Sequence, residues 1–512
     1  MMCALQYIKR HTWWRGASSA VAAVLFLLLV YAVAYHGTDL WKLWLPTESY
    51  NDNVMYNRQL VGILVSGQPQ GYFGYDESHA LIGHFGAWGP ILMYLYSIPA
   101  MLIGIGFNTM FWCNILFAVV GWSIFVCGAQ LTWKRQLVFA IAVGCIWTPL
   151  QQIFSGSAEP LQYFLILIVL GSSMALRHQW RLWWYILLLA ACFLTTATRA
   201  YTVLLWIYPM VLSLRRQRRW SVISAALMAV SLACYFAVTK WCNAPFFGGV
   251  DLDFSAATLL MTGKISMAVQ YQIGRIANQI EILWRDYIYP TLKGEAKMQG
   301  TAFLVLLFLI VLTALSVVID FLKKRAVRIR VLALIFVLVS LIALFSLYDM
   351  NPMARHCTML ALPLLVATVY EANKSLILCL PILLVPLVAG KTLMFYPLPT
   401  YSEKIDSQIQ QIQNALQSSL EMNESEDPWS YTLAYSWGDN VFHGYLYGVP
   451  AGMGIEFDFN TYIADPANTI HSRYAMVGHG TDAEARLVRD GWQELVSTED
   501  LIIYEQPQAA RE

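Results

Sequence analysis

Charged side chains are scarce in this sequence. Asp, Glu, Lys and Arg make up 13% of its 512 residues and hydrophobic residues 58%, whereas soluble domains are about 25% charged. Apolar runs recur between Ala17 and Pro397 and reach the roughly 20 residues that a bilayer crossing requires. The composition therefore excludes an ordinary soluble domain and predicts a chain that crosses a membrane many times.

Several function classes lack their signatures. The net charge is +1, so no surplus of either sign indicates nucleic acid as a partner. No nucleotide-binding loop, dinucleotide fingerprint, zincin motif or serine-hydrolase turn stands in a supporting context, so no cofactor is expected. The nine cysteines lie mostly in apolar runs and match neither a disulfide framework nor a metal site. A divalent metal stays open as an alternative that the sequence does not indicate. The internal repeats of many transporters are also missing.

The apolar runs predict an all-α membrane module of about twelve or thirteen helices. They lie at 17–36, 89–106, 108–131, 136–152, 160–176, 182–198, 200–214, 220–241, 301–322, 331–348, 357–371 and 375–397. Three cations precede the first run, which is long and shows no small-residue cleavage site. We therefore expect an uncleaved first span rather than a signal peptide.

Cation-rich loops set the expected orientation, because such loops stay in the cytoplasm. They lie at 134–135, 177–181, 215–219 and 323–330. This places the loop 37–88 and the tail from Tyr401 on the extracytoplasmic side of an inner or plasma membrane. A cytoplasmic N-terminus and an outer C-terminus need an odd number of spans, whereas the count is about twelve. We expect the miscount in 131–200, where the runs are short.

Two parts are expected in the chain. Residues 1–400 form the membrane module, with outer loops at 37–88 and 242–300. Residues 401–512 form a small extracytoplasmic α/β domain, because a helical pattern at 403–420 is followed by short β-type runs and one further helix-like run. Five tail residues lack a metal-binding spacing and are expected to be surface or structural residues: His443, Glu456, Asp458, His471 and His479.

The first loop combines carboxylates with aromatic residues. Such a mixture is typical of sugar sites, where aromatic faces cover the ring, and a carboxylate such as Asp52 can act as general base on a hydroxyl. A solvated loop with interfacial aromatics is the other interpretation, and we favour the functional one. The candidates for substrate binding in this loop are Tyr56, Asp76, Glu77, His79, His84 and Trp88.

A second group of residues lies at the expected outer ends of spans. A cation within apolar sequence is costly, and a lipid phosphate is its natural partner, while snorkelling toward headgroups is the alternative. The candidates for lipid-phosphate binding are Arg199, Tyr201, Arg355, His356 and Lys391. Glu159 begins a span and either complements the helix dipole or faces the substrate site.

Short motifs resemble those of the GT-C glycosyltransferases, which are integral membrane enzymes that use polyprenyl-phosphate-linked sugars. The stretches that carry the resemblance are NDNVMYNRQ and GYFGYDESHALIGHFGAWGP in the first loop, with ATRAYT and ARHCTMLALP before later spans. The first loop is similar to the family pattern of an acid, a tyrosine one turn later and a small-Trp-x-Pro entry into a span. Many members carry two adjacent acids, whereas Asn53 follows Asp52 here, which counts against metal bridging by paired acids.

The resemblance implies an inverting mechanism. Asp52 deprotonates a hydroxyl of a glycan, lipid or protein acceptor, and this oxygen attacks the anomeric carbon of a polyprenyl-phosphate sugar. Arg199 and Arg355, with His356 or Lys391, stabilise the departing lipid phosphate. Two alternatives stay open: a lipid-linked sugar flippase or exporter, which needs polar residues along a membrane path, and a polysaccharide polymerase, whose large catalytic loop usually comes later in the chain.

Overall fold

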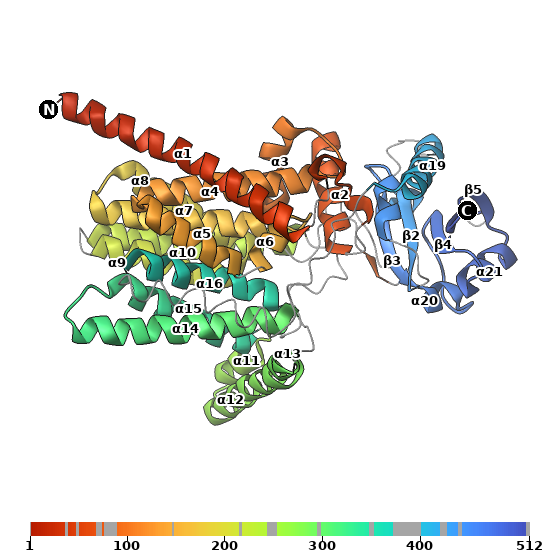
Figure 1. The fold of residues 1–512 in the computed structure, drawn as a ribbon. Coiled ribbons are helices and arrows are strands. Elements are labelled where there is room, and N and C mark those ends of the chain that lie inside the picture. The colour runs from red at the N-terminus through yellow and green to blue at the C-terminus, as the bar shows by residue number, and fades with distance from the viewer. Residues whose placement is uncertain are drawn as a thin grey trace.

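The computed structural model describes most of the chain in thirteen segments. They are residues 2–35, 39–47, 51–67, 74–75, 90–145, 148–214, 218–242, 253–293, 298–347, 353–371, 401–419, 427–438 and 443–507. A helical bundle forms one end of the molecule and a small domain with a sheet forms the other, and the N-terminus lies at the far end of the bundle from that domain (Figure 1).

Six helices of the described segments are long and apolar enough to cross a membrane. They are Trp14–Val33 in α1 (Met2–Ala34), α4 (Thr109–Ala129), α7 (Glu159–His178), α10 (Arg218–Cys242), Ala302–Leu322 in α14 (Met298–Leu322) and α15 (Arg328–Leu347). Shorter helices complete the bundle: α3 (Ile91–Ile103), α5 (Trp133–Cys145), α6 (Thr148–Ile153), α8 (Leu182–Thr198), the 3₁₀ helix η3 (Ala200–Trp206), α9 (Ile207–Leu214) and α16 (Met353–Glu371). The chain is a multi-pass helical membrane protein, and its last expected span, 375–397, lies outside the described residues.

Helix α7 is the central helix of the bundle. Its apolar window is 94% buried, against 22% for α1 at the periphery. Where α7 crosses α4, a Cβ added to Gly128 would lie 2.2 Å from the carbonyl oxygen of Gly171, and one added to Gly171 would lie 2.7 Å from Cα of Phe125. Small residues let two helix backbones approach closely inside a membrane, so this crossing depends on both glycines.

The expected span at 89–106 does not have the length of a span. Helix α3 has 13 residues, about 20 Å at a rise of 1.5 Å per residue, while the hydrocarbon core is about 30 Å thick. The helix ends at Gly104, whose φ of 94° lies in a region that side chains disfavour.

The chain also enters and leaves α3 at the same end of the bundle. Near its start, the hydroxyl of Tyr94 donates to the carbonyl of Gly67, 3.5 Å away at the end of α2. Just after it, Asn108 accepts a 3.1 Å hydrogen bond from the backbone N–H of Leu45, shortly before α2. The helix at the expected span 136–152, α5, also has only 13 residues. The miscount therefore stays open between 89–106 and the stretch 131–200 where we expect it.

The small domain is the expected α/β unit. Its sheet has the order β1-β3-β2-β4-β6-β5. The first four strands are parallel, and β6 runs antiparallel to both of its neighbours, β4 and β5. The strands are β1 (Gly74–Tyr75), β2 (Thr432–Trp437), β3 (Gly454–Phe459), β4 (Tyr474–Gly478), β5 (Gln493–Ser497) and β6 (Leu501–Glu505). Helix α19 (Glu403–Ser419) and the 3₁₀ helix η7 (His443–Gly448) share one apolar cluster with the sheet, and α20 (Asn460–Ala464) and α21 (Asp482–Arg489) share another.

Strand β1 comes from the first loop, not from the tail. Gly74 and Tyr75 pair with Glu456 and Phe457 of β3 in parallel register. A strand can join this sheet only when both segments lie on one side of the membrane. The loop 37–88 and the tail therefore share a side, as the sequence predicts.

The described part of the long loop 242–300 is helical. Its helices are α11 (Ser255–Met261), α12 (Ile265–Ile282), a π-helical turn η4 (Leu283–Ile288) and α13 (Tyr289–Leu292). Arg275 of α12 forms a 2.7 Å ion pair with Asp253, just before α11. Exposed apolar side chains at Ile265, Val269 and Ile273 lie on one face of α12, which is typical of a helix on a membrane surface.

Candidate active site

The first turn of α2 (Asn51–Ser66) contains Asp52. The side chain of Asp52 lies outside the described part, but its neighbour Asn53 is 3% exposed and packs on Gly156. A Cβ added to Gly156 would lie 3.2 Å from Cβ and 3.6 Å from Cα of Asn53. The backbone at Asp52 therefore lies beside the turn that leads into α7.

Hydrogen bonds from two neighbouring helices hold this turn. The side-chain amide of Asn114 in α4 donates to the carbonyl oxygens of Ser155 at 2.8 Å and Ser157 at 2.9 Å. Tyr96 of α3 donates its hydroxyl proton to Asn114 Oδ1 at 2.7 Å. These buried bonds fix the turn before α7, and so fix the position of the first residue of that helix.

That first residue, Glu159, forms an ion pair with Arg199. Arg199 Nη2 lies 3.2 Å from Glu159 Oε1, and each side chain is 1% exposed. Arg199 ends α8 with an extended backbone, φ −148°, before the chain turns into η3. Next to the pair, Gln162 Nε2 donates to Thr198 Oγ1 at 2.6 Å. The two residues that the sequence suggested for separate roles are partners in the structure.

Helix α16 lies next to η3. The hydroxyl of Tyr201 donates to Sδ of Met359 at 3.8 Å. Arg355 and His356 precede Met359 in α16 by four and three residues, a spacing that places them on the same face of the helix. The backbone of these two candidates is therefore near Tyr201, while their side chains lie outside the described part.

The remaining candidates are distributed as follows. Tyr56 is 7% exposed and belongs to the core of the bundle. Asp76 and Glu77 directly follow β1 in the sequence. The candidates that lie outside the described residues are Asp76, Glu77, His79, His84, Trp88 and Lys391.

Three tail residues differ from a surface interpretation. Glu456 and Asp458 are fully buried on β3, where they alternate with Ile455 and Phe457 and so share the opposite face of the strand. His443 is partly buried, and its Nδ1 lies 3.0 Å from the hydroxyl of Tyr435. No group of three His, Cys, Asp or Glu side chains that could hold a metal occurs within the segments that the structure describes.

Arg58 of α2 was not among the candidates, although it contacts the small domain. It is 8% exposed and donates to the backbone carbonyls of Leu446, Val449 and Pro450. The sequence signal was weak: a single cation in the run NVMYNRQLVGILV, with partners almost four hundred positions away.

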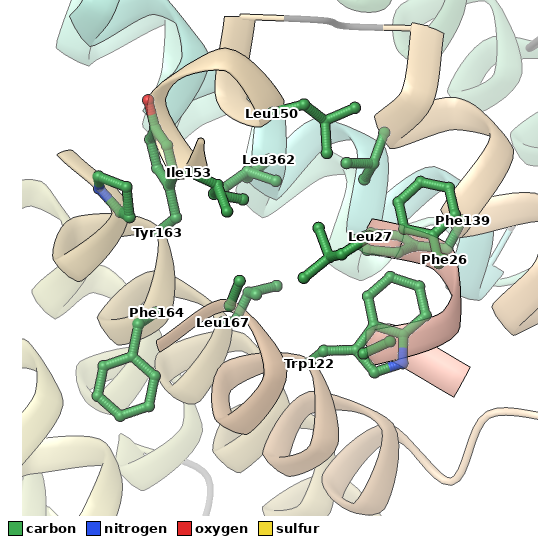
Figure 2. A pocket seen from close by; sticks show the side chains of 14 residues that line it. Phe26, Leu27, Trp122, Phe139, Leu150, Ile153, Tyr163, Phe164, Leu167 and Leu362 are labelled. Atoms are coloured by element: carbon green, nitrogen blue, oxygen red, sulfur yellow. The ribbon is translucent and has the colours of Figure 1, made fainter. Parts of the chain in front are cut away.

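An apolar pocket in the bundle begins next to Glu159. Figure 2 shows side chains from α1, α4, α5, α6, α7 and α16 around it. Its lining includes Pro160, which directly follows Glu159, and Tyr163, whose hydroxyl donates to Gln152 Oε1. The full lining is Ala23, Phe26, Leu27, Ala118, Trp122, Phe139, Val143, Leu150, Ile153, Pro160, Tyr163, Phe164, Leu167 and Leu362. Such a lining suits a hydrocarbon chain.

Solved structures share this fold. The archaeal oligosaccharyltransferase AglB from Archaeoglobus fulgidus, in complex with an inhibitory peptide and a dolichol-phosphate, is 13% identical, with 97% of this chain and 74% of that chain covered and a TM-score of 0.51. The apo form of the oligosaccharyltransferase from the same organism is 12% identical, with 90% of this chain and 69% of that chain covered and a TM-score of 0.51. ArnT from Cupriavidus metallidurans, bound to undecaprenyl phosphate, is 11% identical, with 95% of this chain and 99% of that chain covered and a TM-score of 0.49.

No protein-family model and no curated protein matches the sequence. The fold comparison therefore rests on the two archaeal structures, whose TM-scores exceed 0.5. The chain shares its fold with these two oligosaccharyltransferase structures.

Proposed function

We propose that this chain is a membrane glycosyltransferase that moves a sugar from a polyprenyl-phosphate donor to an acceptor hydroxyl on the outer face of the membrane. One observation carries the proposal. Three features lie at the end of the bundle that meets the small domain (Figure 1): the first turn of α2 with Asp52, the buried pair of Glu159 and Arg199, and the start of α16 with Arg355. A base and cations near one another are the groups that such a transfer requires.

The reaction requires one proton acceptor and one anion-binding group. Asp52 takes the proton of the acceptor hydroxyl, whose oxygen forms a bond with the anomeric carbon from the face opposite the phosphate. The bond between that carbon and the phosphate oxygen breaks, and its electron pair leaves with the lipid phosphate. The configuration at the anomeric carbon is thereby inverted. Phosphate is a good leaving group, so no general acid is needed.

The buried pair refines the expected role of Arg199. Because Glu159 neutralises most of its charge, Arg199 acts as an oriented donor of hydrogen bonds and supplies little net charge. The charge of the leaving phosphate is then balanced mainly by Arg355, His356 and Lys391. Glu159 holds the guanidinium in place for this task.

A lipid donor is supported by the apolar pocket beside Pro160. An amphiphilic substrate with its phosphate near Glu159 and Arg199 can place hydrocarbon in such a space. A dolichol-phosphate is bound in the AglB structure, which agrees with a donor of this class.

The opposite end of the bundle counts against a transporter. There Arg330 is 0% exposed and bonds Asp320 at 2.9 Å, and its Nε lies 3.6 Å from Glu371. This buried network joins α14, α15 and α16 at that end of the bundle. A translocation path between these helices would have to break it in every cycle.

The test is a transfer assay with purified protein in lipid nanodiscs. A panel of radiolabelled polyprenyl-phosphate sugars is offered together with glycan, lipid and peptide acceptors. We expect one donor to lose its label to one acceptor class, with the opposite anomeric configuration in the product. Movement of an intact labelled donor across proteoliposomes without transfer would reject the proposal in favour of a flippase, and growth of a repeating product would favour a polymerase.

A further inference from the structure

Helix α2 belongs to two apolar cores at once. Val54 and Met55 lie in the cluster of the small domain, with Ile409 and Ile412 of α19. Further along the helix, Leu60 and Ile63 lie in the core of the bundle, and α2 lies between the two parts of the molecule (Figure 1). The helix that begins with Asp52 is therefore a joint between the domain and the bundle.

Arg58 is the polar link in this joint. Its Nη1 donates to the carbonyl of Leu446 at 3.1 Å and to that of Val449, and its Nη2 donates to that of Pro450 at 2.9 Å. Burial lowers the pKa of Arg58 to about 10, so the guanidinium stays charged at neutral pH. Burying a cation among carbonyl oxygens has a large desolvation cost. The planar, forked guanidinium offsets part of this cost, because it donates several hydrogen bonds in fixed directions.

The carbonyls that accept these bonds lie on a rigid support. A Cβ added to Gly448, at the end of η7, would lie 2.7 Å from the carbonyl oxygen of Ile409 and 3.0 Å from Cβ of Ile412. The segment is therefore packed directly on α19, with no room for a side chain. Because the acceptors cannot shift easily, Arg58 transmits the position of the domain to α2.

We propose that Arg58 is a positioning residue, through which the small domain sets the place of Asp52 relative to the bundle. This inference rests on the proposed function, in which Asp52 is the base. Arg58 is six residues after Asp52, about 9 Å along the same helix. A displacement of about 1 Å at a reacting group can lower the rate on the order of a hundredfold, so the loss of this link acts on turnover.

The chain offers a matched control in Arg486 of α21. It is 7% exposed and donates to three backbone carbonyls, those of Ile463 at 2.6 Å, Asp465 at 2.7 Å and Asn468 at 2.5 Å. It lies within the small domain and makes none of the contacts with α2. Arg58→Met and Arg486→Met each remove a guanidinium held by three backbone carbonyls, and Arg486→Met also removes a 3.0 Å ion pair with Asp490. Only Arg58 lies on the helix that contains Asp52.

The experiment compares kcat, the donor KM and the melting temperature of the full-length variants in nanodiscs. We expect both variants to melt at lower temperature. Arg58→Met lowers kcat at least about tenfold with a nearly unchanged donor KM, and Arg486→Met keeps the kcat of the wild type. Arg58→Lys restores part of kcat, because an ammonium group can still reach one carbonyl.

Equal losses of kcat in Arg58→Met and Arg486→Met would overturn the inference, since they would show an effect of stability alone. A loss confined to donor KM would overturn it as well. Hydrogen–deuterium exchange gives a readout that does not depend on activity: Arg58→Met should speed exchange in the amides of 51–58, and Arg486→Met should not. If the wild type transfers no sugar while this difference in exchange appears, the proposed function fails and the link that Arg58 makes between α2 and the small domain stands. If the difference is missing, the positioning role fails.

Discussion

The carboxylate of Glu159 and the guanidinium of Arg199 lie 3.2 Å apart, and both side chains are almost completely buried. The pair joins the first residue of α7 to the end of α8. Both ends lie beside the turn that packs on Asn53. Each member of such a pair leaves a buried charge behind when the other is removed.

Removing Arg199 alone should therefore affect both stability and activity. Arg199→Met leaves the carboxylate of Glu159 buried without this cation, which typically costs about 3–5 kcal/mol. The double variant with Glu159→Gln should be more stable than Arg199→Met, because no buried charge is left behind. Both should use the lipid-phosphate donor on the order of a hundredfold less well. Thermal melting and kcat/KM measure the two effects separately.

Arg177 is the control for this prediction. It bonds Glu371 at 3.3 Å at the opposite end of α7 and is 30% exposed, so Arg177→Met should leave kcat/KM unchanged. A wild-type kcat/KM in the double variant would contradict the role of the pair in phosphate binding.

The crossing of α4 and α7 should not tolerate a methyl group. Gly171→Ala places a Cβ 2.7 Å from the backbone of Phe125, so the helices must separate, at a cost of about 1–3 kcal/mol. Gly274→Ala in α12 meets nothing within 4 Å and should be neutral or slightly stabilising. Melting temperatures of the two variants in the same detergent test this, and equal values would show that the close approach is not present.

The ion network at the far end of the bundle should support stability without serving catalysis. Arg330 bonds Asp320 and the hydroxyl of Ser316 at 2.8 Å, so Arg330→Met should destabilise the protein by about 3–5 kcal/mol. Arg325, which is 48% exposed, should matter little on substitution. Turnover per folded molecule should stay unchanged in both variants. A loss of donor turnover in Arg330→Met at full folding would connect this end to the reaction and reopen the flippase alternative.

The small domain should lose stability in mildly acidic solution because of His443. Burial lowers the pKa of His443 below its usual 6.5, and the ring lies against Tyr435 and Phe457. The unfolded chain therefore binds this proton more readily than the folded one, so the stabilisation is complete above pH 6.5 and declines as the pH falls through the lowered pKa. His443→Gln should flatten the dependence of melting temperature on pH between about 7 and 5. The exposed His471 is the control, and an unchanged slope in His443→Gln would contradict the assignment.

Hydropathy predicts the architecture well because length and apolarity are local properties. At 89–106 the apolar run gives a helix of only 13 residues, which is shorter than the run itself. The α/β character of the tail is also local and was predicted. The two-residue strand β1 was not, since its pairing with β3 depends on a partner almost four hundred residues away.

The candidate site shows the same division. An arginine in apolar sequence, such as Arg199, can be recognised from its surroundings as costly and therefore purposeful. Its pairing with Glu159, 40 positions earlier, follows from the antiparallel packing of α7 and α8, which no single stretch encodes. Arg58 was missed for a related reason, because its partners are backbone carbonyls that every residue possesses.

The base is the central claim, and Asp52→Asn tests it most directly, because the substitution keeps the shape of the side chain and removes its basicity. Transfer from a labelled polyprenyl-phosphate sugar is measured beside equilibrium binding of the same donor, with Glu77→Gln in parallel. We predict that Asp52→Asn binds the donor as the wild type does and transfers no sugar, while Glu77→Gln mainly raises the apparent Michaelis constant. Normal turnover in Asp52→Asn together with an inactive Glu77→Gln would contradict the account and move the base to the second half of the first loop.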